Sequence, residues 1–116
     1  MKDQVTLFER ILSGEINCDK VYEDEFTFAF HDISPVAPVH ILIIPKKKMV
    51  NVASSSDSDI EILGRILSTA RKVAQQLHID TSGYRLVLNN NEDGGQTVHY
   101  LHCHLLGGRA LGWPPG

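Results

Sequence analysis

The connections between the predicted strands restrict the fold of this chain more than any other feature. Residues 26–32 and 39–45 both read as strands, and the loop between them carries Pro35 and Pro38, which cannot pair regularly. Residues 83–90 and 97–106 form another such pair, joined by the turn-forming "NEDGG". Parallel strands need a crossover of a dozen residues or more, so short connections join antiparallel neighbours. The sequence therefore predicts an antiparallel sheet.

Two segments carry the apolar periodicity and the end signals of helices. Thr6 and Glu9 match a capping box, and Gly14 is predicted to end the first helix. The second helix lies within residues 56–77, where Ser58 and Glu61 match another capping box. Its apolar stripe recurs every three or four residues and consists of Ile60, Leu63, Leu67, Ala70, Ala74 and Leu77.

The predicted strands differ in how they are buried. A strand near Val21 and Tyr22 leads through an acidic turn into residues 26–32. Alternation there places Phe26, Phe28, Phe30 and Asp32 on one face, with Thr27, Ala29 and His31 on the other. Residues 39–45 are nearly all apolar, which predicts burial on both faces. Two helices and about five strands give an α+β fold with an antiparallel sheet.

Composition restricts the class of protein. The 116 residues are enough for one domain, with 42% hydrophobic content to form its core. The net charge of −3 and the scattered basic residues predict no nucleic-acid partner. No apolar run approaches twenty residues, and the N-terminus reads as an amphipathic helix, so neither a membrane span nor a leader is expected. Cys18 and Cys103 form no CxxC pair, which favours a reducing, cytoplasmic location.

Three of the six histidines lie close together, at positions 99, 102 and 104. In a strand, His102 and His104 share a face with Tyr100, whereas His99 and Cys103 point to the other side. Two imidazoles about 6–7 Å apart on a strand face can bind a metal, hold an anion, or divide the roles of nucleophile and acid.

The residues before the histidines favour an anion over a metal. Gly94 and Gly95 let backbone N–H groups approach an anion, although a structural turn explains the glycines equally well alone. Gln96 and Thr97 add polar atoms, and the combination with paired histidines favours phosphate. A metal needs a third ligand. His40 is the one candidate, since no carboxylate is close in sequence, so no metal site is predicted.

At this point "GGQTVHYLHCHLLGGR" resembles the histidine-triad (HIT) signature, His-φ-His-φ-His-φ-φ, in the Hint branch of nucleoside phosphoramidases. "FERILSGEI", "FAFHDISPVAPVHILIIPKK", "GYRLVLNNNEDGGQ" and the tail "GGRALGWPPG" are also similar to that branch. The resemblance covers nearly the whole chain and implies a single HIT domain over residues 1–116. It also implies a homodimer with one continuous sheet and chemistry that needs no cofactor.

The resemblance assigns roles to the histidines. It implies that His102 is the nucleophile and forms a covalent nucleotidyl-histidine. It implies that His104 contacts phosphate and helps to deliver a proton to the leaving group, and that His40 lies behind the nucleophile.

The remaining site residues carried over from the family bind the nucleotide. Asp32 matches the carboxylate that accepts the ribose hydroxyls, although a polar strand end is the plainer reading of the residue itself. Trp113 matches a tryptophan that reaches the partner subunit's site. The apolar walls of the base pocket match Phe8, Ile11, Phe30 and Ile33. The positions that line the phosphate match Asn89, Gly95 and Thr97.

One position departs from the family. Tyr100 stands where the first triad histidine belongs, and His99 stands where the branch often has tyrosine. Lys48 replaces a frequent histidine as well, on the surface. We expect Tyr100 to act from behind the nucleophile, as a hydrogen-bond partner together with His40, or else only to fill core volume.

The sequence therefore predicts a homodimeric hydrolase of purine nucleoside 5′-phosphoramidates or related nucleoside 5′-monophosphate derivatives. One alternative is a nucleotide-binding or scaffold protein with weak turnover, because Tyr100 replaces a triad histidine. Another is a dinucleoside polyphosphate hydrolase. The dimer is also expected from the residues, since Ile62 and Ile66 beside the main helical stripe, Trp113 and the sheet edges all need cover.

Overall fold

Five strands and two α-helices organise residues 5–116, which are the residues that this computed structural model describes. Methionine 1 to glutamine 4 of the predicted amphipathic N-terminus lie outside the described residues. In chain order the elements are α1 (Leu7–Leu12), β1 (Lys20–Glu23), β2 (Thr27–His31), β3 (Val39–Pro45), the short 3-10 helix η1 (Asp57–Asp59), α2 (Ile60–Gln76), β4 (Tyr84–Val87) and β5 (Cys103–Gly107).

The strands form one sheet in the order β1-β2-β3-β5-β4, and every neighbouring pair is antiparallel. The α+β prediction with an antiparallel sheet is therefore confirmed. β3 lies at the centre, and all of its residues after Val39 are buried, as the apolar run predicted. Since β3 pairs with both β2 and β5, its register places Leu42 opposite Phe30 on one side and opposite His104 on the other.

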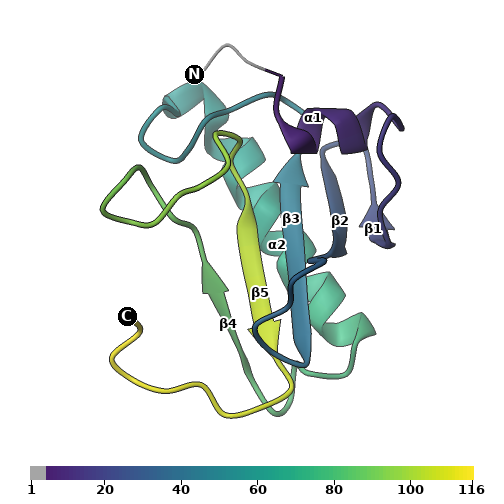
Figure 1. Cartoon of the computed structure of the whole chain (residues 1–116), viewed down its shortest axis with the longest axis vertical. Helices are drawn as coiled ribbons and strands as arrows, with labels where there is room; N and C mark the ends of the chain where they lie inside the picture. The colour runs from purple at the N-terminus through teal and green to yellow at the C-terminus, as the bar shows by residue number, and fades with distance from the viewer. Residues whose placement is uncertain (1–4) are drawn as a thin grey trace.

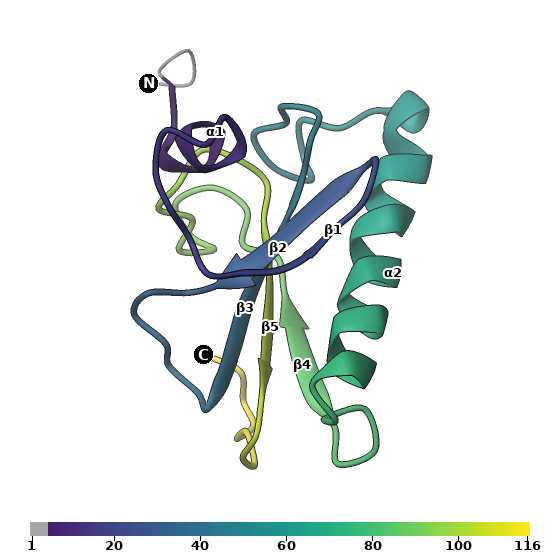
Figure 2. The same cartoon turned by 90° about the vertical axis from the view of Figure 1, so that its right-hand side faces the viewer.

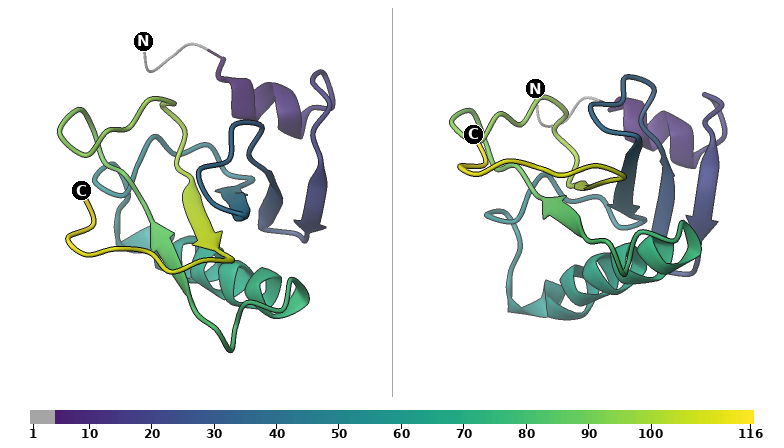
Figure 3. Two further views of the ribbon diagram at one scale, coloured as in Figure 1. Left: turned by 60° about the horizontal axis from the view of Figure 1, so that its bottom comes forward. Right: turned by 90° about the horizontal axis from the view of Figure 1, so that it is seen from below.

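The helices cover opposite faces of the sheet. Figures 1 and 2 show α2 running along one face, while the short α1 lies over the upper part of the other. The views in Figure 3 show the sheet as the layer between the two helices. Between α2 and the sheet lies a buried cluster that includes Ala29, Ile41, Ile43, Ile66 and Leu105. The opposite face buries a more aromatic cluster that includes Phe8, Phe28, Phe30, Leu42 and Tyr100.

The two predicted helix starts have different outcomes. The capping box at α1 is confirmed, because Thr6 Oγ1 accepts from the Glu9 N–H and Glu9 Oε1 accepts from the Thr6 N–H. The box predicted at Ser58 and Glu61 is wrong. The carboxylate of Asp59 instead accepts from the Ser56 N–H at 3.0 Å and from Lys47 Nζ at 2.6 Å. The Asp59 carboxylate therefore belongs to the start of η1, and at the N-cap position of α2 it makes no side-chain cap hydrogen bond.

The buried face of α2 is rotated from the predicted stripe. Ile60 and Leu67, both assigned to that stripe, are 66% and 49% exposed, whereas Ile66 is only 1% exposed. The fully buried positions of α2 are Ile66, Thr69, Ala70, Val73 and Ala74. Apolar residues are so frequent in the first half of this helix that two adjacent faces fit the helical period. Packing against the sheet determines which of these two faces is buried.

Two strand predictions also need correction. Phe26 does not share a strand face with Phe28, because it precedes β2 and its ring lies 4.4 Å below the guanidinium of Arg65 on α2. The last strand begins at Cys103 and not at residue 97, since residues 98–100 form a bend. The Leu101 N–H bonds to the Met49 oxygen at 2.6 Å, so the segment before β5 is held by a loop and not by a strand.

Within residues 5–116 no helix combines the length and the apolar character that crossing a membrane requires.

Candidate active site

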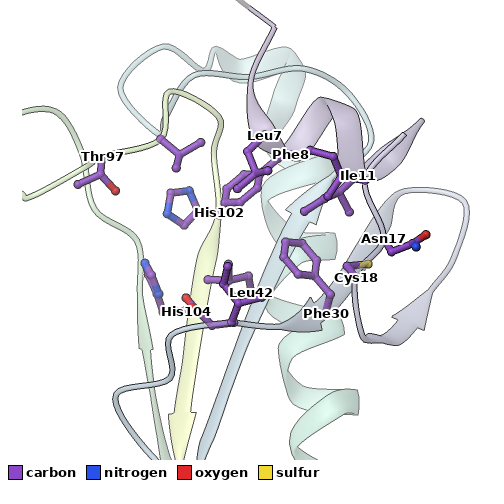
Figure 4. Close-up of a pocket in the computed structure, with 14 residues that line it drawn as sticks. Leu7, Phe8, Ile11, Asn17, Cys18, Phe30, Leu42, Thr97, His102 and His104 are labelled. Carbon is purple, nitrogen blue, oxygen red and sulfur yellow. The ribbon is translucent and has the colours of Figure 1, made fainter. Parts of the chain in front are cut away.

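A cavity of about 240 Å³ lies between α1 and the sheet, on the face opposite α2. Its walls are mostly apolar, from Phe8 and Ile11 of α1, Phe30 of β2 and Leu42 of β3. Polar side chains gather at one end, as Figure 4 shows for Thr97, His102 and His104. The cavity therefore suits a ligand with a flat apolar part and an anionic or polar end.

His102 is buried at the end of the bend, just before β5. Its Nδ1 lies 2.7 Å from the backbone oxygen of Tyr100. A carbonyl oxygen can only accept a hydrogen bond, so Nδ1 carries the proton and Nε2 of the neutral ring keeps its lone pair. The ring of Phe8 meets the imidazole edge to face at 5.0 Å and restrains its rotation. His102 is thus held as the tautomer that a nucleophile at Nε2 requires.

A chain of hydrogen bonds decides the tautomers of the other two histidines. The Val36 N–H donates to His40 Nδ1 at 3.1 Å, so the proton of neutral His40 is on Nε2. That nitrogen lies 2.9 Å from His104 Nδ1 and donates to it. His104 must then carry its own proton on Nε2. One ring nitrogen with a lone pair, on His102, and one N–H donor, on His104, are therefore available at this site.

The site disfavours the charged form of all three imidazoles. Burial, together with the nearby rings of His102 and His40, lowers the pKa of His104 from 6.5 to about 4. Burial also lowers the pKa values of His102 and His40, against the opposing effect of the Asp32 carboxylate. The three rings are neutral at pH 7, which leaves the His102 lone pair free.

Asp32, His40 and His104 place three potential ligand atoms within 4.8 Å of one another. A tetrahedral zinc ion at its usual bond lengths holds two imidazole nitrogens about 3.3 Å apart and needs a lone pair on each. Here His40 Nε2 and His104 Nδ1 are 2.9 Å apart, and Val36 forces the His40 proton onto Nε2. This geometry is that of a hydrogen-bonded chain and does not fit a metal without a change of tautomer.

Most of the site residues predicted from the sequence meet in the cavity. Eight of them line it together: Phe8, Ile11, Phe30, Asp32, Ile33, Thr97, His102 and His104. Asn89 lies instead beside a neighbouring hollow that also contacts His40 and His104. His40 contacts His104 and not the nucleophile candidate His102.

Gly95 and Trp113 do not line the cavity. The Gly95 N–H donates to the Glu92 oxygen at 2.9 Å and closes the turn, so it is not available to an anion there. The positive φ of 81° explains the glycine by its backbone alone. Trp113 is 82% exposed, with the Arg85 guanidinium 5.9 Å from its ring.

Tyr100 contacts β3 and α1. Its hydroxyl donates to the Pro45 oxygen at 2.5 Å and makes no hydrogen bond to His102. The expected hydrogen bond between this hydroxyl and the nucleophile is therefore absent. The ring packs edge to face on Phe8 at 6.1 Å, and Phe8 in turn packs on His102. Tyr100 acts on His102 through its backbone oxygen and through Phe8.

Sequence reasoning missed several members of the site. Leu42 lines the cavity because its register places it between Phe30 and His104, and an all-apolar strand gives no signal for which face holds a ligand. Ile16, Asn17 and Cys18 enter from the segment between α1 and β1, to which the sequence assigned no binding role. Gln96, assigned to the anion, is instead a buried bridge between loops, bonding to Asn51 and to the Val50 oxygen.

Comparison with known proteins identifies the family. The model of the HIT domain family matches residues 13–111. The structure of a HIT family hydrolase from Legionella pneumophila has a TM-score of 0.94 and 49% identity, covering 97% of this chain and all of that one. The structure of a HIT family hydrolase from Clostridium thermocellum has a TM-score of 0.91 and 45% identity, covering 94% and 95% of the two chains.

Relatives in plants and cyanobacteria are similar over nearly their whole lengths. An uncharacterised HIT-like protein of Synechococcus elongatus is 49% identical over 111 residues, which cover 96% of each chain. A protein of Zea mays named as a 14 kDa zinc-binding protein is 48% identical, covering all of this chain and 91% of its own.

The lowered histidine pKa values predict a loss of stability in acid. Below about pH 6.5 the unfolded chain binds more protons than the folded one, so the free energy of unfolding falls as the pH drops toward 4. His104→Gln removes one of these groups and should reduce the change in urea midpoint between pH 7 and pH 5. The exposed His99→Gln is the control. An equal pH dependence for the parent and His104→Gln would contradict the assignment.

Removal of the Tyr100 hydroxyl should affect stability and leave the site intact. Tyr100→Phe leaves the buried Pro45 oxygen without this donor, which should lower the free energy of unfolding by about 1–3 kcal/mol. The His102 Nδ1 bond to the Tyr100 backbone oxygen is unaffected, so the NMR signature of that tautomer should persist. Tyr84→Phe, at a partly exposed tyrosine, is the matched control. A lost Nδ1–H signal would show that the hydroxyl acts on His102 after all.

Proposed function

The chain belongs to the HIT domain family, and on that premise we propose that it hydrolyses purine nucleoside 5′-phosphoramidates or related nucleoside 5′-monophosphate derivatives. The observation that carries the proposal is the pair of tautomers: a free lone pair on His102 Nε2 beside an N–H on His104 Nε2. Both rings line one cavity with an apolar interior. The names of the Legionella and Clostridium relatives as HIT family hydrolases support the same reaction class.

The cavity supports binding of a nucleoside with its phosphate at the histidines. The base would lie in the apolar part of the cavity, against the wall formed by Phe8 and Phe30, whose rings pack edge to face at 5.7 Å. The ribose hydroxyls would donate to Asp32. One oxygen of this carboxylate, Oδ1, accepts from the Ser34 N–H at 2.8 Å, which fixes its orientation. Thr97 adds a hydroxyl at the polar end for the phosphoryl oxygens.

The reaction would proceed in two displacements at phosphorus. His102 Nε2 attacks, the bond from phosphorus to the leaving nitrogen breaks, and His104, which binding of the phosphoryl group has made an imidazolium, gives its Nε2 proton to the leaving amine and returns to the neutral ring. Water then attacks the phosphorus, its proton passes to His104, and the His102–phosphorus bond breaks to release the nucleoside monophosphate. Nδ1 of His102 keeps its hydrogen bond to the Tyr100 oxygen and stabilises the imidazolium-like charge on the phosphorylated ring.

Proton delivery by His104 depends on the substrate itself. The pKa of His104 is about 4 in the empty site, so the ring starts neutral at pH 7. A bound phosphoryl group places negative charge beside the ring and raises its pKa, because an opposite charge favours the imidazolium. Substrate binding would thus bring a proton into the site.

Two alternatives predict different results with the same ligands. A nucleotide-binding or scaffold protein would bind adenosine monophosphate with negligible hydrolysis of any derivative. A dinucleoside polyphosphate hydrolase would need cations for the additional phosphates, yet neither lysine nor arginine lines the described cavity. Lys46, Lys47 and Lys48 are engaged with Glu23, Asp59 and Glu9. The phosphoramidate is therefore the better match.

We also propose a homodimer, formed at the β4 edge of the sheet. β4 is the last strand in the sheet order, so within the described residues its outer edge has no partner strand. Trp113 lies at this edge, because Arg85 of β4 donates to the Gly112 oxygen at 2.7 Å, and its ring is 82% exposed. An open edge beside a large exposed ring favours a two-fold interface that continues the sheet.

Cytoplasmic location is part of the same proposal. The thiols of Cys18 and Cys103 are both free, as a reducing compartment would keep them.

His102→Ala should abolish turnover of an adenosine 5′-phosphoramidate, with a loss on the order of 10³-fold or more in kcat, because the attacking nitrogen is removed. His99→Ala is a matched control, since His99 lies three positions away and does not line the cavity. Burst kinetics of the parent should show the covalent intermediate. Equal rates for His102→Ala and the parent would exclude the proposed nucleophile.

Sedimentation at micromolar concentration should give a species of twice the 12.9 kDa chain mass. Trp113→Ala should weaken that association, whereas Ile33→Ala, which alters a 91% exposed apolar side chain away from β4, should not. A single species of 12.9 kDa for the parent would reject the dimer.

A further inference from the structure

A second hollow lies on the other side of His104. Its volume is about 340 Å³, and His40, Asn89 and His104 contribute its polar wall. The remaining wall is apolar and comes from the loop before β3, from β4, from β5 and from the tail: Val36, Val87, Leu106 and Pro115. His104 is the one residue that also lines the cavity of the proposed nucleoside site. The two spaces therefore meet at the side chain assigned to proton delivery.

In-line displacement places the leaving group opposite the attacking nitrogen. His102 lines only the first cavity, whereas His104, which must reach the leaving atom, faces both. A substrate with its base under α1 would therefore extend its leaving group past His104 into the second hollow. We propose that this hollow selects leaving groups with a neutral, apolar body, and that Val36 is the specificity-determining residue. This inference rests on the proposed function and deepens it.

The lining chemistry supports that selection. The described residues that line the hollow include no lysine, arginine, aspartate or glutamate. Its two histidines would carry charge only if they were protonated. In the ligand-free site burial disfavours that protonation, since it lowers the pKa values of His40 and His104. A phosphate chain or a carboxylate would find no fixed cation among the lining side chains, whereas an alkyl or aryl group would contact the apolar wall. Asn89 supplies one amide for a neutral polar atom of the leaving group.

The backbone of Val36 holds its side chain at the rim of this hollow. Its N–H donates to His40 Nδ1 at 3.1 Å, and its oxygen accepts from Arg109 Nη2 at 3.0 Å. The side chain itself is 62% exposed, so it contributes little to the core. A substitution at Val36 therefore changes the surface that meets the leaving group while both backbone hydrogen bonds are kept.

The test compares two adenosine 5′-phosphoramidates, one of phenethylamine and one of β-alanine, whose leaving group carries a carboxylate. The parent should have the higher kcat/KM for the phenethylamine substrate. Val36→Lys should reduce the ratio of the two kcat/KM values by about tenfold, through faster turnover of the β-alanine substrate and slower turnover of the other. Val36→Ile should retain the parental ratio. Val52→Lys introduces the same change at a 41% exposed valine that does not line the hollow.

The outcomes separate this inference from the proposed function. Turnover by the parent with an unchanged ratio in Val36→Lys, or an equal change in Val52→Lys, overturns the role of Val36 and leaves the hydrolase intact. No turnover of either substrate by the parent overturns both. Thermal melting of each variant identifies loss of fold, and Val36→Thr, which removes apolar surface without adding charge, then provides the same comparison.

Discussion

Burial of β3 on both faces is the constraint on which the rest of the structure depends. From His40 to Pro45 every residue of this strand is buried, and its backbone pairs with β2 on one side and β5 on the other. One face packs on α2 through Ile41 and Ile43, and the other contributes Leu42 and Ile44 to the aromatic cluster under α1. A strand with so little freedom makes a rigid base for the site, since His40 is part of it.

The chemistry of the site follows from hydrogen bonds to the backbone. Val36 fixes the tautomer of His40, His40 fixes that of His104, and the Tyr100 oxygen fixes that of His102. None of these bonds requires a particular side chain at position 36 or 100. This is why a tyrosine at position 100 is compatible with an ordered His102 ring: the part of the residue that holds His102 is its carbonyl. The side chain contributes packing on Phe8 and a hydroxyl bond to Pro45.

His104 connects the two spaces of the site. On one side lies the cavity of the proposed nucleoside site, and on the other lies a hollow with apolar walls. The lysines that follow β3 are paired with acidic groups on β1, η1 and α1, so their charge stabilises the scaffold instead of entering either space. The site holds three neutral imidazole rings, and among the described residues the Asp32 carboxylate is the one acidic side chain that lines its cavity.

The sequence by itself determined the antiparallel α+β sheet, the buried central strand, the capping box of α1 and the pairing of His102 with His104. The first three follow from local rules: short connections, continuous apolar residues, and a cap three residues from its partner. His102 and His104 lie two positions apart, and their rings meet at 4.9 Å although only His104 belongs to β5. Tertiary structure decided what local rules leave equivalent. Ile66 and not Leu67 faces the sheet, the Asp59 carboxylate pairs with Lys47, and His40 contacts His104 and not His102. Each depends on which distant residue arrives within a few ångströms, and a period along the chain carries no information about that.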